Sequence, residues 1–120
     1  MPYSWDLWIV YADPHTGKMG YIPFKNITGF YANGRGLGIG YCGTDGIHPF
    51  WSNSSARTAE KTEHPEAILK VLIAKLIEQM WECRKRSWVT IQAPMLVNIS
   101  EIAEEIYDDM REAALQAGGN

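Results

Sequence analysis

The sequence predicts an α+β fold: an N-terminal antiparallel β-sheet with two C-terminal helices packed on it and a short strand between the helices. The chain has 120 residues, so we expect a single domain over residues 1–120. Hydrophobic residues make up 46% and charged residues 21%, as is typical of folded proteins. Residues 1–58 hold nine of the 11 glycines and most of the aromatic residues, whereas residues 59–117 follow the order helix, strand, helix.

The strands are predicted from short runs of aromatic and branched residues that are separated by turn residues. The first run stops at the turn sequence of residues 13–17, and the second returns beside it. Pro23 has no N–H to donate, which favours a sheet edge or a break. Asn33 and Gly34 accept the backbone angles of a tight turn and predict a hairpin. The predicted strands cover residues 5–11, 20–24, 29–32, 37–41 and 50–52.

The first helix is predicted from Pro65, whose fixed φ suits the first helical position, to about Lys85. Its apolar residues form more than one stripe, so we expect it to lie under the sheet and also to contact the second helix or a second subunit. One face is predicted to hold Leu69, Leu72, Ile73, Leu76, Met80 and Cys83, and the wider apolar surface Ile68, Val71, Ile77 and Trp81.

A strand over residues 87–93, ended by Pro94, and a second amphipathic helix complete the prediction. Asn98 and Glu101 resemble a capping box at the start of that helix, and Gly118 and Gly119 end it. The acidic side of this helix is either a solvated face or a surface for a basic partner. It is predicted to consist of Glu101, Glu104, Glu105, Asp108, Asp109 and Glu112.

Composition and charge argue against several functional classes. No charge-free apolar run is long enough to cross a membrane, and the first residues lack the basic start of a secretion signal. We therefore expect a cytoplasmic protein, in the host cell if a phage encodes it. The formal net charge of -3 argues against general nucleic-acid binding. Cys42 and Cys83 show no metal-ligand spacing and are predicted to be free, buried thiols.

Groups suited to catalysis or metal binding are sparse. The three histidines each lie beside a proline in turn-like sequence. A set of Cys42 or Ser52 with His48 and Asp45 can be written down, but nearness in sequence is poor support for a catalytic geometry. We expect no enzyme activity, no metal and no cofactor.

Residues 34–40 have glycine at every second position, which in a strand places all four glycines on one face. That face is predicted to be a flat patch under the long helix, a subunit contact or the floor of a ligand site. The dinucleotide-binding motif GxGxxG is not matched, because Ile39 stands where its third glycine is needed after Gly34 and Gly36. Residues 35–40 match the short R-x-x-G-x-G element of the coenzyme A loop of acetyltransferases. That element must open a helix, whereas residues 41–46 are predicted to form strand and turn.

Aromatic side chains and arginines occur together in the first half, a combination suited to a nucleotide. Arg35 and Arg57 offer planar forks for phosphate, and an aromatic face can stack a base. Residues 52–58 add hydroxyls, an amide and backbone donors, although the same residues also suit an ordinary polar loop. The aromatic residues near these arginines in sequence are Tyr31, Tyr41, Phe50 and Trp51.

This organisation resembles a phage anti-defence family, the anti-Thoeris sponges that sequester cyclic ADP-ribose signals. The resemblance lies in size, in an aromatic and glycine-rich sheet followed by two helices, and in scattered arginines. It implies dimers or higher homo-oligomers that bind a small nucleotide near subunit interfaces. Asn98 is equally suited to cap a helix, and Arg111 to pair with Asp108. With Tyr41, the predicted ligand residues are Arg35, Arg57, Arg111, Trp51 and Asn98.

We therefore expect a non-enzymatic protein that captures a cyclic nucleotide signal without changing it. A sponge needs affinity rather than complementarity to a transition state. One alternative is a protein-binding inhibitor of the anti-CRISPR kind that uses the acidic helix face. The other alternative is a small transferase or hydrolase.

Overall fold

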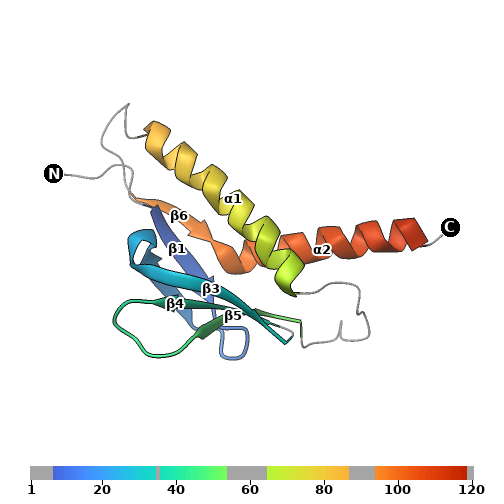
Figure 1. The fold of residues 1–120 in the computed structure, drawn as a ribbon, viewed down its shortest axis with the longest axis horizontal. Helices are drawn as coiled ribbons and strands as arrows, with labels where there is room; N and C mark the ends of the chain where they lie inside the picture. The colour runs from blue at the N-terminus through green and yellow to red at the C-terminus, as the bar shows by residue number, and fades with distance from the viewer. Residues whose placement is uncertain (1–6, 35, 54–64, 87–93, 119–120) are drawn as a thin grey trace.

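The computed structural model describes residues 7–34, 36–53, 65–86 and 94–118. It confirms the predicted α+β class, with strands first, two helices and a short strand between them (Figure 1). The elements are β1 (Leu7–Ala12), β2 (Met19–Pro23), a 3-10 turn η1 (Phe24–Asn26), β3 (Ile27–Asn33), β4 (Gly36–Tyr41), β5 (His48–Ser52), α1 (Pro65–Arg86), β6 (Met95–Asn98) and α2 (Ile99–Gly118).

The described strands form two three-stranded sheets rather than one. The first sheet has the order β2-β1-β6, and the second sheet has the order β3-β4-β5. All neighbouring strands are antiparallel except β1 and β6, which are parallel because α1 lies between them in the chain. Pro23 ends β2 at an edge of the first sheet, as predicted.

The turns follow the predicted chemistry. Asp13 Oδ1 accepts hydrogen bonds from the backbone N–H groups of His15 (2.7 Å) and Thr16 (3.2 Å), and Gly17 has a φ of 79°. This ordered turn joins β1 to β2. Gly34 has a φ of 59° between β3 and β4, where Asn33 pairs with Gly36. The predicted hairpin across Asn33 and Gly34 is therefore confirmed.

The strand between the helices is formed by residues 95–98 and begins directly after Pro94. Pro94 thus precedes this strand, and the segment predicted as a strand, residues 87–93, lies outside the described residues. A proline beside the first residue of an edge strand costs no ladder hydrogen bond. β6 leads directly into α2, which extends beyond the two sheets (Figure 1).

One buried cluster joins both sheets and both helices. The face of α1 that enters it is largely the predicted one, with Leu69 and Met80 partly buried at its edges, but it includes Ile68 and leaves out Ile73. Ile68 is fully buried, whereas Ile73 is 40% exposed. Ile77 and Trp81 are more exposed than Ile73. The α1 residues buried in the cluster are Ile68, Leu72, Leu76 and Cys83.

The two cysteines differ in their surroundings. Cys83 is buried on the inward face of α1, as predicted, but Cys42, predicted to be buried, is exposed because it follows the last residue of β4 in a loop. Neither forms a disulfide.

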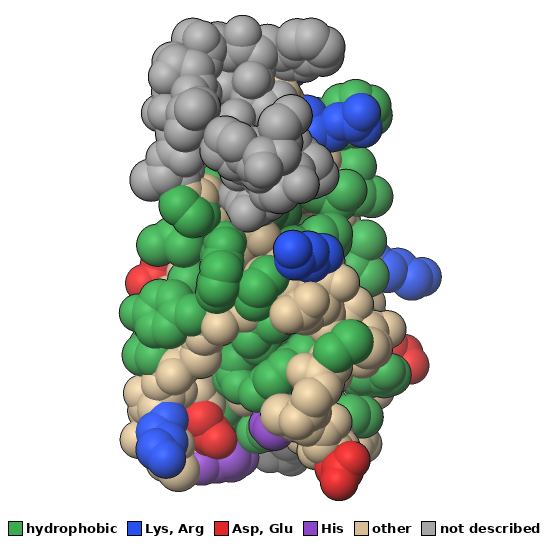
Figure 2. Space-filling view, turned by 90° about the vertical axis from the view of Figure 1, so that its left-hand side faces the viewer, with side chains coloured by type: hydrophobic (Ala, Val, Ile, Leu, Met, Phe, Trp, Pro, Cys, Tyr) green, Lys and Arg blue, Asp and Glu red, His purple; other side chains and the backbone are tan. Residues whose placement is uncertain are grey.

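Hydrophobic side chains are visible over much of the side of the molecule shown in Figure 2, among scattered charged ones.

Candidate functional site at the end of the second sheet

A hollow of about 150 Å³ lies where the β3–β4 turn meets the start of α1. We call it the hairpin-end hollow. Pairing of Gly36 with both Asn33 of β3 and Ser52 of β5 brings the end of β5 to the same end of the sheet. The residues that line the hollow are Ala32, Asn33, Gly34, Pro65 and Glu66.

Both predicted phosphate-binding arginines belong to chain segments that adjoin, in sequence, residues lining this hollow. Arg35 directly follows Gly34, and Arg57 belongs to the segment that links the end of β5 to Pro65. The side chains of Arg35 and Arg57 lie outside the described residues. What the structure brings together is therefore the backbone on either side of them.

The electrostatics of the hollow have two opposed contributions. The first turn of α1 presents N–H groups without helical partners, and the helix dipole favours an anion there. Glu66 stands in that first turn and lines the hollow. Its carboxylate is stabilised by the dipole and repels any other anion. A phosphate would need cations to outweigh Glu66.

Trp51 is packed into the core near this end of the sheet rather than presented to solvent. Its side chain is 4% exposed, and its ring lies 5.3 Å from the Tyr107 ring, measured between centroids. The indole Nε1 donates a 2.9 Å hydrogen bond to Glu104 Oε1. A ligand could stack on Trp51 only if these neighbours moved.

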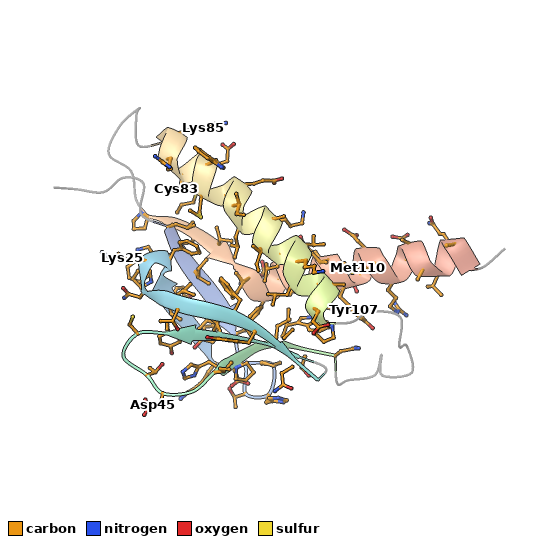
Figure 3. All side chains as sticks on the ribbon, in the orientation of Figure 1. Lys25, Asp45, Cys83, Lys85, Tyr107 and Met110 are labelled. Atoms are coloured by element: carbon orange, nitrogen blue, oxygen red, sulfur yellow. The ribbon has the colours of Figure 1, made fainter. Side chains whose placement is uncertain are left out.

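Arg111 follows Tyr107 by one helical turn on α2 and is half-buried. Tyr107 and Met110 lie where α2 meets the start of α1 (Figure 3). Of the predicted ligand residues, Trp51 and Arg111 are thus on elements that reach the hairpin end of the molecule.

Asn53 is a residue that sequence reasoning did not select individually. It follows β5 directly and is 8% exposed, and its Oδ1 accepts no hydrogen bond from the described residues. A buried amide oxygen without a donor is costly. An asparagine beside a buried tryptophan at a strand end was the available sequence signal, but burial cannot be read from that pattern.

Tyr41 lies at the opposite end of β4 from Gly36, a separation of about 17 Å along the strand. It belongs to a second group, the tyrosine cluster, which we define as Tyr11, Tyr41, Thr44 and His48. The Tyr41 ring stacks on His48 with centroids 4.8 Å apart, and the hydroxyl groups of Tyr41 and Tyr11 are 3.3 Å apart. The structure therefore does not bring Tyr41 to the hairpin end.

The tyrosine cluster is held by local and cross-sheet contacts. Burial, followed by the hydrogen bond with Tyr41, raises the pKa of Tyr11 to about 12. Tyr11 is thus a neutral hydroxyl at physiological pH. His48 Nε2 lies 3.1 Å from Thr44 Oγ1, and within the described residues it has no hydrogen bond to Cys42 or Asp45. The catalytic set written from the sequence is not assembled around His48.

Asn98 caps α2. Its Oδ1 accepts a 3.1 Å hydrogen bond from the Glu101 backbone N–H, which is the cap predicted as one of its two roles.

The acidic residues of α2 differ in their exposure to solvent. Glu104 is half-buried against Trp51, contrary to the predicted solvated side, while the exposed members are Glu101, Glu105, Asp108, Asp109 and Glu112.

The glycine face of β4 does not lie under the long helix, because Leu37 and Ile39 point into the core and the glycines point the other way. Other parts of the chain cover it. A Cβ at Gly36 would lie 3.0 Å from the Trp51 carbonyl oxygen, and one at Gly38 would meet the Ile47 side chain. Close approach of strand and loop atoms therefore explains these glycines.

Among the described residues, no group of His, Cys, Asp and Glu could hold a metal ion, and no helix is long and apolar enough to span a membrane. Comparisons of the chain with protein families, with curated proteins and with solved structures found no match.

Proposed function

We propose that this protein is a non-enzymatic binder that sequesters a small cyclic nucleotide of the cyclic ADP-ribose type, with its phosphates at the hairpin-end hollow. One observation carries the proposal. The hollow is bounded by the turn that continues into Arg35 and by the helix start that follows the segment containing Arg57. Two guanidinium groups and a helix N-terminus are the groups that proteins use to hold phosphate.

The size of the hollow constrains how such a ligand would bind. Pockets that enclose a small molecule measure about 300–1,000 Å³, and this hollow has about 150 Å³. It has room for a phosphate group rather than for a whole nucleotide. The base and sugar would therefore lie outside it, against other side chains or a second subunit.

The test is capture followed by release. The pure protein is incubated with cyclic ADP-ribose isomers and cyclic oligonucleotides, freed of unbound ligand and heat-denatured, and the released compounds are identified by mass spectrometry. We expect one intact ligand per site. An altered ligand would indicate a transferase or hydrolase, and an empty protein would favour a macromolecular partner.

Matched variants locate the site. We expect Arg35→Ala and Arg57→Ala each to weaken binding about tenfold or more, since each removes a charge-assisted contact. Glu66→Gln should tighten it because it removes a like charge from the hollow. Arg84→Ala, at the far end of α1, is the control and should bind as the parent does. Unchanged binding by both Arg35→Ala and Arg57→Ala would contradict the proposed site.

A second candidate function, inhibition of a protein partner, is favoured by the exposed carboxylates on the part of α2 that extends beyond the sheets. Such a surface suits a basic partner. Reversing the charge of Glu105 and Asp108 together should abolish that complex. Glu104 is left unchanged in this test because its carboxylate binds Trp51.

A further inference from the structure

The first sheet has an outward face that is almost entirely apolar. Strand register places Trp8 opposite Pro23 on one side and Leu96 on the other, and it places Val10 opposite Tyr21 and Asn98. Side chains directly opposite one another share a face. We call this surface the outer face; it consists of Trp8, Val10, Ala12, Met19, Tyr21, Pro23, Leu96 and Asn98.

The opposite face of the same sheet is already used by the core. Leu7, Ile9 and Val97 point inward and are at most 7% exposed. An antiparallel strand pair such as β1 and β2, with one buried face, normally has polar residues on the other. Here the outer face has no charged residue, and its polar groups are the Tyr21 hydroxyl, the Trp8 indole N–H and the amide of Asn98, whose oxygen caps α2.

The large side chains on the outer strands of this face are open to solvent, while Val10 on the central strand is 6% exposed. Leu96 is 60% exposed, Tyr21 57% and Met19 49%. At about 200 Å² for each fully exposed large residue, these three alone expose roughly 330 Å² of surface, most of it on carbon and sulfur atoms. Half-buried Trp8 and Pro23 extend the patch. A standard interface of about 800 Å² per partner is a little over half apolar, or about 450 Å².

We propose that the outer face binds the same face of a second copy of this chain, so that the two first sheets stack across a twofold axis. Because the face has no charge, a partner must present an apolar surface of similar size, and a second copy does so by symmetry. Stacked sheets lie about 10 Å apart, a distance that large side chains such as Tyr21 and Leu96 fill.

The exposed stripe on α1 is a poorer match for self-association. Ile73, Ile77 and Trp81 follow one another at four-residue spacing, but charged residues interrupt the same helix face. Arg84 lies over the Trp81 ring, 5.3 Å from its centroid. This stripe therefore supplies the control for the test.

The experiment is sedimentation equilibrium from about 1 µM to about 100 µM for the parent chain and three variants. Tyr21→Glu and Leu96→Glu place a charge in the proposed interface, and Ile77→Glu places one on α1. All three positions are about half exposed or more, so each variant should fold, which circular dichroism verifies. The sedimentation samples contain no nucleotide, so the measured mass is independent of whether the proposed ligand binds.

We expect the parent and Ile77→Glu to have twice the mass of one chain. Tyr21→Glu and Leu96→Glu should weaken dimerisation at least 100-fold and sediment as single chains. A monomeric parent overturns the proposal, and its binding to phosphatidylcholine vesicles would then assign the face to a lipid surface. A dimer that survives both outer-face variants, or one that only Ile77→Glu disrupts, also overturns it.

Discussion

At the scale of single residues, the hydroxyl group of Tyr11 links folding to pH. Burial and the hydrogen bond with Tyr41 raise the pKa of Tyr11 from 10.0 to about 12. Below pH 10 the tyrosine is protonated in both states and its full stabilisation is present. Between pH 10 and pH 12 the unfolded chain loses the proton first, so the free energy of unfolding falls as pH rises.

We predict that the parent loses up to about 3 kcal/mol more stability than Tyr11→Phe over this range, because each pKa unit corresponds to about 1.4 kcal/mol. Urea unfolding of both proteins from pH 8 to pH 12 measures the difference. Comparison with Tyr11→Phe cancels the titration of the lysines and the remaining tyrosines. Parallel pH profiles for the two proteins would show that Tyr11 ionises normally in the folded state.

The contact between Trp51 and Glu104 gives a second prediction for single residues. Glu104→Ala leaves the buried indole N–H without its carboxylate acceptor, so we expect a loss of about 1.5–3 kcal/mol of stability. Glu104→Gln keeps an acceptor oxygen and should cost less. Glu105→Ala, at an exposed position, should stay within about 0.5 kcal/mol. Unfolding followed by tryptophan fluorescence measures all three, and equal losses for Glu104→Ala and Glu105→Ala would contradict the prediction.

The same residues show where sequence reasoning stops. Trp51 was predicted to stack a ligand because aromatic residues and arginines occur together around it. Its actual partners, Glu104 and Tyr107, are more than 50 positions away, and no local pattern pairs them. Tyr11 and Tyr41 likewise meet across 30 positions. The strand that contains each tyrosine could be predicted, but not the contact between them.

At the scale of elements, local chemistry predicted most starts and ends, and for α1 most of the side that faces inward. Pro65 begins α1 and Asn98 caps α2, because these positions depend on the backbone around them. The buried side of α1 instead depends on where the sheets lie. Apolar residues extend around much of the helix, so the edge of the buried side was open: Ile73 was placed on the inward face, but the structure buries Ile68 and exposes Ile73.

The cap of α2 can be separated from any role of Asn98 in ligand binding. Asn98→Ala removes the acceptor for the Glu101 N–H and should cost about 1 kcal/mol of stability. Asn98→Asp keeps the acceptor oxygen and should unfold as the parent does. Urea unfolding and hydrogen exchange at the Glu101 amide test the cap. Equal stability of Asn98→Ala and the parent would show that other groups support the start of α2.

The two Asn98 variants also test the predicted ligand role. Asn98→Asp removes the side-chain N–H donors while it keeps the cap. If Asn98→Asp is stable but no longer binds a nucleotide that the parent binds, the amide has a function besides capping. If it binds as the parent does, Asn98 is a structural residue.

At the scale of the whole molecule, the division into two sheets was not predictable from the strands alone. Each strand has the expected composition, but β6 reaches β1 only after more than 80 intervening residues. The resulting shape is elongated, 55 by 34 by 20 Å, and α2 extends beyond the sheets. Of the predicted ligand residues, Trp51 and Tyr41 consequently lie toward opposite ends of the second sheet, Asn98 ends β6 of the first sheet, and the arginines cannot be placed by spacing alone.

One side chain joins the parts of this architecture. Ser100 Oγ, in the first turn of α2, accepts a 2.8 Å hydrogen bond from the Ala12 N–H at the end of β1 and donates a 2.7 Å bond to the Phe50 carbonyl of β5. It therefore connects the first sheet, the second sheet and α2. Ser100 stands two residues after the helix cap, and nothing in its local sequence indicates these partners.

We predict that Ser100→Ala lowers the free energy of unfolding by about 2 kcal/mol, because it leaves a half-buried donor and an acceptor without partners. Hydrogen exchange should accelerate at the Ala12 amide and in both β1 and β5, since the loss acts on both sheets. Thr16→Ala is the control: its hydroxyl accepts one 3.2 Å bond from the Lys18 N–H in an exposed turn, and its loss should change stability by less than about 0.5 kcal/mol. Faster exchange confined to the first sheet would mean that the bond to Phe50 does not hold the sheets together. Unchanged exchange in both would mean that packing of the shared core alone does so.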